Sequence, residues 1–121
     1  MIEPSCPVCV VHDDDAFRRA LIASLDQRHF TVTFIGDGDE AVEVLRQRAF
    51  RVVIVCVAMK TNRGFRALEY LRTNRNGTCG VIVLGDPDPE IRNYTKWVDE
   101  TLLKPVDPDY VATRARAYCA C

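Results

Sequence analysis

The chain has 121 residues, of which 48% are hydrophobic and 27% are charged. This length predicts one domain over residues 1–121 that buries its own core, and the balance is that of a globular protein rather than of a disordered chain. The 16 basic and 17 acidic residues give a net charge of −1, so no overall positive field draws the domain to nucleic acid or to an anionic membrane. The apolar runs are too short to span a membrane and MIEPSCPVC lacks a signal-peptide pattern, which predicts a cytoplasmic location.

In the first half of the chain, short apolar runs are followed by segments whose apolar residues recur at helical spacing. These elements are, in chain order, a strand at 8–11, a helix carrying Phe17 to Leu25, a strand at 30–35 and a helix carrying Ala41 to Leu45. Asp15 is predicted to cap the first helix, because a carboxylate at that place accepts a hydrogen bond from a first-turn backbone N–H. Gly36 and Gly38 mark the turn before the second helix.

The second half of the chain continues the same alternation. Its predicted elements are, in order, a strand at 51–57, a helix from Gly64 through Leu71, a strand at 80–84, a short helix at about 89–97, a strand at 101–103 and a final helix that opens at Asp107-Pro108. The run at 51–57 is apolar on both faces, which is typical of a central strand in a parallel sheet. Tyr110, Val111 and Ala115 are expected to face inward from the final helix.

Five strands alternating with five helices through short loops favour right-handed crossovers and a parallel sheet covered on both faces. We therefore predict a flavodoxin-like α/β fold, a three-layer (βα)5 sandwich whose five-stranded parallel sheet has the order 2-1-3-4-5. Ligands of such sheets bind beyond the carboxyl ends of the strands, near the switch point between the first and third strands. In this chain that place is marked by His12-Asp13, Cys56, Gly85 and Lys104.

Five stretches of sequence carry a family resemblance because of their order. They are VCVVHDDDAFRRAL, DGDEAVEVLR, VVIVCVAMKTNRGFRALEYLR, VIVLGD and LLKPVD. In this order they resemble the first strand with its acidic loop, the start of the second helix, the third strand with its helix, the fourth strand and the closing Lys-Pro corner of the receiver domain of two-component response regulators. The resemblance covers essentially the whole chain, whereas any one stretch alone is a weak signal.

The resemblance implies a site in which a paired acidic motif and an aspartate at the end of the third strand hold Mg²⁺. In such receivers that aspartate accepts phosphate from a histidine kinase, and a hydroxyl residue, an aromatic residue and a lysine respond to it. This sequence matches the family at Asp13, Lys104, Pro105 and Gly64. It departs at the acidic pair, the acceptor, the hydroxyl position, the aromatic position and the usual proline, which become His12-Asp13, Cys56, Gly85, Thr101 and Lys60.

These departures predict a degenerate phosphoacceptor pocket in a receiver-like signalling module. Mg²⁺ prefers hard oxygen ligands, whereas this pocket offers an imidazole and a thiol, so no cofactor is expected and Asp13 is the one weak metal candidate. Gly85 has no hydroxyl and Thr101 has no aromatic ring. We expect no catalytic residues and a pseudo-receiver that acts through protein contacts, with a protein partner, with an output domain after residue 121, or as a homodimer.

Several alternatives remain open at this stage. Asp14 or Asp86 would compensate for the lost carboxylates in a domain that is still an active phosphoacceptor. Cys56 would be a buried apolar filler or, with His12 and Lys104 nearby, a thiolate that serves as a redox sensor. Cys56, His12 and Asp13 also have the ligand types of a soft-metal site.

The remaining cysteines form a second group. Cys6-Pro7-Val8-Cys9 near the start and Cys119-Ala120-Cys121 at the end are expected to approach each other at the edge of the sheet opposite the pocket. Because cysteines inside cells are usually reduced, we expect free thiols or a disulfide formed in air. A zinc site built from four thiolates is the alternative.

Overall fold

The computed structural model describes residues 5–26, 30–57, 64–86 and 95–119. Within these ranges the strands form one parallel sheet in the order β2-β1-β3-β4-β5. The strands are β1 (Cys6–Val11), β2 (Phe30–Ile35), β3 (Val52–Cys56), β4 (Gly80–Gly85) and β5 (Glu100–Leu103). The helices are α1 (Asp15–Asp26), α2 (Gly38–Gln47), α3 (Gly64–Thr73) and α5 (Pro108–Arg116).

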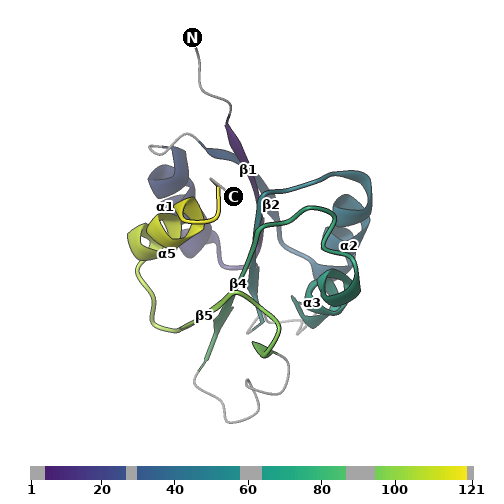
Figure 1. Cartoon of the computed structure of the whole chain (residues 1–121). Coiled ribbons are helices and arrows are strands. Elements are labelled where there is room, and N and C mark those ends of the chain that lie inside the picture. Colours follow the sequence, from purple (N-terminus) through teal and green to yellow (C-terminus); the bar gives the residue numbers. More distant parts are fainter. Residues whose placement is uncertain (1–4, 27–29, 58–63, 87–94, 120–121) are drawn as a thin grey trace.

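Helices cover both faces of the sheet. Figure 1 shows α1 and α5 side by side on one face and α2 and α3 side by side on the other. A sheet between two helical layers is what alternating parallel strands and helices produce when each crossover is right-handed. The predicted flavodoxin-like α/β fold and its strand order are therefore confirmed.

The core lies on the two faces of the central strands. Every residue of β3 and of β4 is buried, which explains why these strands appear in the sequence as unbroken apolar runs. The helices add Leu21 and Leu25 from α1 and Leu71 from α3, all essentially inaccessible to solvent. The edge strands β2 and β5 are only partly buried. The rigid centre of the sheet therefore carries the strand ends that form the site.

The start of α1 differs from the prediction by one residue. Asp14, and not Asp15, provides the cap, because the backbone N–H of Phe17 donates to Asp14 Oδ1 at 3.0 Å. Asp15 is the first residue of the helix itself. The cap belongs to the residue before the helix, where the side chain can reach the free N–H groups of the first turn.

The orientation of α5 also differs from the prediction. Tyr110 is 52% exposed and does not face inward. The helix buries Val111, Ala112 and Ala115, and Tyr110 lies beside that stripe rather than on it. The predicted opening of the helix is correct, because Asp107 Oδ1 accepts a hydrogen bond from the backbone N–H of Asp109 at 2.9 Å.

The short helix predicted at about 89–97 lies mainly outside the described residues. Among those that are described, 95–98 form a turn in which the backbone N–H of Val98 donates to the carbonyl of Thr95 at 3.3 Å. None of the helices in the described ranges is long and apolar enough to cross a membrane.

Of the alternatives left open for the terminal cysteines, the structure contains a disulfide. Cys6 is disulfide-bonded to Cys119, and Cys79 is also disulfide-bonded. The first strand and the segment after α5 reach the same edge of the sheet, which places the Cα atoms of Cys6 and Cys119 5.8 Å apart, within the range that a disulfide spans. Cys9 and Cys56 are free and buried, while Cys121 lies outside the described residues.

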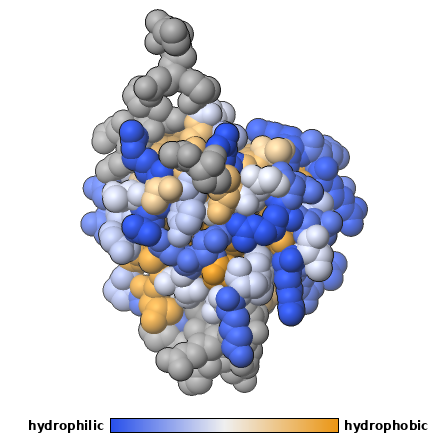
Figure 2. All heavy atoms as spheres, in the orientation of Figure 1, coloured by the Kyte–Doolittle hydropathy of each residue, from blue (hydrophilic) through white to orange (hydrophobic). Residues whose placement is uncertain are grey.

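The surface over α2 and α3 is mainly hydrophilic, as Figure 2 shows on that side of the molecule. Arg66 Nε on α3 donates to Asp39 Oδ1 on α2 at 3.0 Å, which joins the two helices across their groove. Both side chains are largely exposed, and exposed ion pairs of this kind contribute about 0–1 kcal/mol. This charged surface therefore adds little to the stability that the core provides.

Candidate functional site

Four neighbouring strands, β1, β3, β4 and β5, end side by side at the carboxyl end of the sheet, where the site was predicted. The register pairs Val11 of β1 with Val55 of β3, and it pairs Gly85 of β4 with Leu103 of β5. The residues that immediately follow these strand ends include His12 and Lys104, while Cys56 is the last residue of β3. The side chains that the sequence assigned to the site therefore come from one edge of the sheet, although they do not all meet.

His12 is a buried, neutral group with a fixed orientation. Its side chain stacks on Phe17 with the ring centroids 4.9 Å apart, and its Nδ1 atom accepts a hydrogen bond from the backbone N–H of Asp14 at 3.0 Å. Burial lowers the pKa of His12, and the Lys104 ammonium lowers it further, while Asp14 and Asp13 act in the opposite direction. An imidazole that accepts at Nδ1 and resists protonation carries its hydrogen on Nε2 at pH 7.

Cys56 and Lys104 are in direct contact. Cys56 is fully buried at the end of β3, and Lys104 Nζ donates to its Sγ atom at 3.0 Å. The backbone N–H of Lys104 donates to the carbonyl of Gly85 at 2.8 Å, which holds the lysine against the end of β4. The position that the family resemblance assigns to the phosphate acceptor is thus a buried thiol paired with a cation.

Three carboxylates lie near this pair in the sequence of strand ends, namely Asp13, Asp14 and Asp86. Asp13 Oδ1 lies 3.9 Å from His12 Nδ1, which is too long for a hydrogen bond. Asp14 is exposed, and its hydrogen bond from the backbone of Phe17 is the main reason that its pKa lies below the ordinary value. Asp86 is also exposed. Asp14 therefore acts as a helix cap, which is a common structural role of aspartates in loops.

A pocket of about 430 Å³ opens beyond the strand ends. Its lining residues are His12, Asp14, Phe17, Asp86, Lys104, Pro105 and Val106. The sequence reasoning did not assign Phe17 and Val106 to the site. Phe17 was expected to be a core residue of the helix. The one feature of the sequence that could have assigned it to the site is its place just after the acidic loop.

Gly85 and Thr101 do not line this pocket. Gly85 is buried and contributes its carbonyl group to the backbone contact with Lys104. Thr101 lies opposite Val83 in the β4–β5 pair, two residues before the end of β5, and is half-buried. Neither residue offers the pocket a hydroxyl group or an aromatic ring.

In the described ranges, no three His, Cys, Asp or Glu side chains are grouped so that they could hold a metal ion. His12 Nδ1 already accepts a backbone hydrogen bond, and Cys56 Sγ is a soft donor in contact with an ammonium group. This set is unsuited to Mg²⁺, which requires oxygen ligands, and the contact of Cys56 with a cation also disfavours the soft-metal alternative.

The parallel sheet in the order 2-1-3-4-5, with a lysine and an acidic loop beyond its carboxyl edge, defines the class of receiver-like α/β signalling domains. Residues 8–116 match the profile of the family described as "Response regulator receiver domain". The chain belongs to this family, and it is therefore a receiver domain of two-component signalling.

Curated relatives and solved structures agree with this membership. The chain is 26% identical over 117 residues to a protein named "Probable transcriptional regulator ycf27" from Guillardia theta, covering 96% of this chain and 46% of that protein. The chain thus spans about half the length of the curated relatives that it matches. A CheY-like receiver domain from Methanospirillum hungatei JF-1 superposes with a TM-score of 0.85 at 17% identity, covering 96% of this chain and 94% of that one.

A third comparison concerns the site. The receiver domain of a sensor histidine kinase from Pseudomonas aeruginosa PAO1 superposes with a TM-score of 0.80 at 16% identity, covering 97% of this chain and 99% of that one. The description of that structure places a magnesium ion in its active-site cleft. At this level of identity the likeness shows a shared fold, while the ligands at the cleft are decided by each chain's own residues.

Proposed function

We propose that this domain is a pseudo-receiver, which signals through protein contacts and is not switched by magnesium-dependent phosphorylation. The observation that carries the proposal is the contact of Lys104 Nζ with Cys56 Sγ at 3.0 Å. A cysteine side chain cannot form the acyl phosphate that a carboxylate forms, and here the side chain is also fully buried. The ammonium group of Lys104 is thus paired with Cys56, which is not a phosphate acceptor.

The remaining features of the pocket support the same proposal. Mg²⁺ needs oxygen ligands, whereas two of the positions that would supply them hold His12 and Cys56, and Asp14 caps α1. The Gly85 position has no hydroxyl group that could follow a phosphoryl group. Compensation by Asp14 would require it to give up the cap of α1.

A protein partner or an output domain would then read the domain through its surface. Among the described residues the large hydrophobic side chains that are most exposed are Leu103 at 49% and Tyr110 at 52%, on β5 and α5. Receivers often signal through the face that contains the fifth strand and the fifth helix, so these side chains are suitable contacts. The name of the Guillardia theta relative, a transcriptional regulator, supports an output domain in the full-length protein.

The proposal is tested by incubating the native protein with MgCl2 and acetyl phosphate and measuring its intact mass. We expect no increase of about 80 Da, the mass of one phosphoryl group, because the pocket has no carboxylate acceptor at position 56. A stable adduct on the native protein would contradict the proposal. Peptide mapping would then show whether Asp14 or Asp86 is the acceptor, and Asp14→Asn and Asp86→Asn variants would verify the assignment.

A redox role of Cys56 is a second candidate function, because the ammonium group of Lys104 would stabilise a thiolate at 3.0 Å. In this reaction the thiolate attacks one oxygen of hydrogen peroxide, the O–O bond breaks, and the products are a sulfenic acid and hydroxide, which takes up a proton to form water. The Lys104 side chain both contacts the sulfur and lines the pocket, whereas Cys56 itself is fully buried, so peroxide would reach the sulfur only when Lys104 moves aside.

Mild peroxide treatment tests this second candidate. If Cys56 is reactive, the intact mass should rise by about 16 Da, one oxygen atom, and dimedone should label Cys56 in a peptide map. The Lys104→Met variant is the matched control, because it keeps a long side chain but removes the charge, and its labelling should be several times slower. Labelling that is equally slow in both proteins, and no faster than at the buried Cys9, would refute a redox role.

A further inference from the structure

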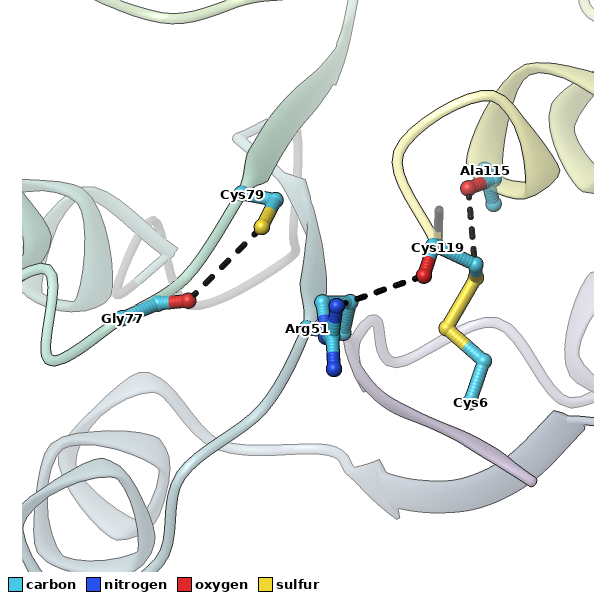
Figure 3. The surroundings of a disulfide bond; sticks show 6 residues. All are labelled: Cys6, Arg51, Gly77, Cys79, Ala115 and Cys119. Carbon is cyan, nitrogen blue, oxygen red and sulfur yellow. Dashed lines mark hydrogen bonds between the residues drawn. A yellow bond between two sulfur atoms is a disulfide. The ribbon is translucent and has the colours of Figure 1, made fainter. Parts of the chain in front are cut away.

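The Cys6–Cys119 disulfide lies at the edge of the sheet opposite the pocket. Cys6 is the first residue of β1, and Cys119 is the last residue of the turn at 117–119 that follows α5, so the bond joins positions 113 residues apart. Figure 3 shows the bond beside Arg51, and it shows Cys79 directly before β4. Both bonded cysteines are half-buried, whereas the free thiols of Cys9 and Cys56 are fully buried.

Other contacts also hold the turn after α5, but they are not covalent. Tyr118 packs directly on Gly80 of β4, where an added Cβ atom would lie 2.7 Å from Tyr118 Cβ. The Tyr118 hydroxyl donates to Glu100 Oε1 on β5 at 2.9 Å, and Glu100 also accepts hydrogen bonds from Arg114. Arg51 Nη1 donates to the carbonyl of Cys119 at 3.4 Å. These contacts join the turn to β4, to β5 and to Arg51, whose backbone N–H donates to the carbonyl of Pro7 on β1, whereas the disulfide is a direct covalent link of the turn to β1.

The surroundings of Cys119 also suit its reduced form. Cys119 Sγ lies 3.6 Å from the carbonyl oxygen of Ala115, as the dashed line in Figure 3 marks. In the disulfide this is only a contact, because a bonded sulfur carries no hydrogen. After reduction the thiol could donate a weak S–H hydrogen bond to the same oxygen. The reduced cysteine therefore has a partner already in place on the last turn of α5.

Cys9, in contrast to the bonded pair, is a thiol that is not suited to thiol–disulfide exchange. It is fully buried in the middle of β1, and burial raises its pKa to about 12. Such a thiol is protonated at neutral pH and therefore cannot attack the nearby disulfide. The Cys6–Cys119 bond is therefore protected from rearrangement through Cys9 and depends on an external thiol.

We propose that Cys6–Cys119 is a thiol–disulfide exchange site whose co-reactant is a dithiol reductant, and that its reduction releases the turn after α5 from β1. One thiolate of the reductant attacks a sulfur of the pair and forms a mixed disulfide, and the other protein sulfur leaves as a thiolate and takes up a proton. The second thiol of the reductant then closes its own disulfide and frees the first cysteine. The protein gains two electrons and two protons, and the reductant loses them.

The experiment uses a Cys79→Ser, Cys121→Ser variant, so that Cys6–Cys119 is the disulfide under test and no new free thiol is created, with dithiothreitol as the dithiol and no denaturant. Alkylation and peptide mapping should show Cys6 and Cys119 newly labelled. Hydrogen exchange at residues 116–119 should become about tenfold faster, because the turn then opens locally, while exchange in β3 stays unchanged. A variant that adds Cys6→Ser to these two substitutions should exchange fast at 116–119 without the reductant and should not respond to it.

Three outcomes would overturn the proposal. The first is a non-reduced digest in which Cys6 and Cys119 are not linked. The second is a bond that dithiothreitol reduces only when the protein is unfolded, which would make it purely structural. The third is equal exchange at residues 116–119 in the oxidised and reduced forms. Should the Cys79→Ser, Cys121→Ser variant fail to fold, the same peptide map and exchange measurements on the natural chain decide between these outcomes, because they report Cys6 and Cys119 separately from Cys79.

Discussion

The double variant His12→Asp, Cys56→Asp is expected to bind Mg²⁺ at least about tenfold more tightly than the natural chain, because it restores hard oxygen ligands beside Asp13. At position 56 the new carboxylate would lie beside Lys104, whose Nζ atom now contacts the sulfur at 3.0 Å, so the cation would offset the cost of burying the charge. At position 12 the new carboxylate would accept the backbone N–H of Asp14 that His12 Nδ1 accepts now. The same variant should also gain about 80 Da from acetyl phosphate with Mg²⁺.

Isothermal titration calorimetry with MgCl2 measures the first effect and intact mass the second. The matched control is His12→Asn, Cys56→Ser, which changes the same two sites to neutral side chains and keeps an oxygen acceptor for the Asp14 N–H. If the charged and the neutral variants bind Mg²⁺ equally, the loss of carboxylates is not what disables this pocket. The proposed pseudo-receiver would then need a different physical explanation, such as the missing hydroxyl at Gly85.

Gly64→Ala is expected to lower the free energy of unfolding by about 1–3 kcal/mol, because the extra methyl group has no space. Gly64 is the first residue of α3, and an added Cβ atom would overlap the carbonyl oxygen of Cys56 and lie 3.3 Å from Val57 Cα. These are backbone atoms at the end of a buried central strand, so they cannot move aside as a flexible side chain can. The close approach of α3 to β3 thus explains why a glycine occupies this position beside the site.

Urea unfolding followed by circular dichroism measures this loss, and Gly36→Ala is the control. An added Cβ atom at Gly36 would lie 3.8 Å from the carbonyl oxygen of His12, which is an ordinary van der Waals distance. The control should therefore change stability by less than about 0.5 kcal/mol. Equal effects of the two substitutions would show that α3 does not pack as closely on Cys56 as the structure indicates.

Most of the fold could be predicted from the sequence, because burial on both faces leaves a clear pattern. The apolar runs that became β3 and β4 are buried at every position, and their alternation with amphipathic segments was enough to predict the parallel sheet and its order. The errors fall where the pattern is weak. The cap of α1 was assigned to Asp15 because Asp14 and Asp15 are chemically equivalent in sequence, and the inward face of α5 was misjudged at Tyr110 because a short helix has few apolar positions.

The site was less predictable than the fold. Topology alone brings the ends of β1, β3, β4 and β5 to one edge, so His12, Cys56 and Lys104 could be assigned to it from the sequence. Their contacts could not be predicted, because a lysine side chain can extend in many directions and only the packing of the folded chain brings Lys104 to the thiol of Cys56. Phe17 was missed for the same reason, since an aromatic residue in a first helical turn faces either the core or the pocket mouth.

The cysteines separate the two kinds of information most clearly. The sequence by itself determined the fold, the edge at which the site lies, and the approach of the first strand to the end of the chain, because each of these follows from apolar periodicity and the connectivity of a parallel sheet. Only the tertiary structure decided that Cys6 pairs with Cys119 while Cys9 stays free, and that Lys104 contacts Cys56. The physical reason is that bonds and contacts depend on separations of a few ångströms and on side-chain direction, which periodicity along the chain does not encode.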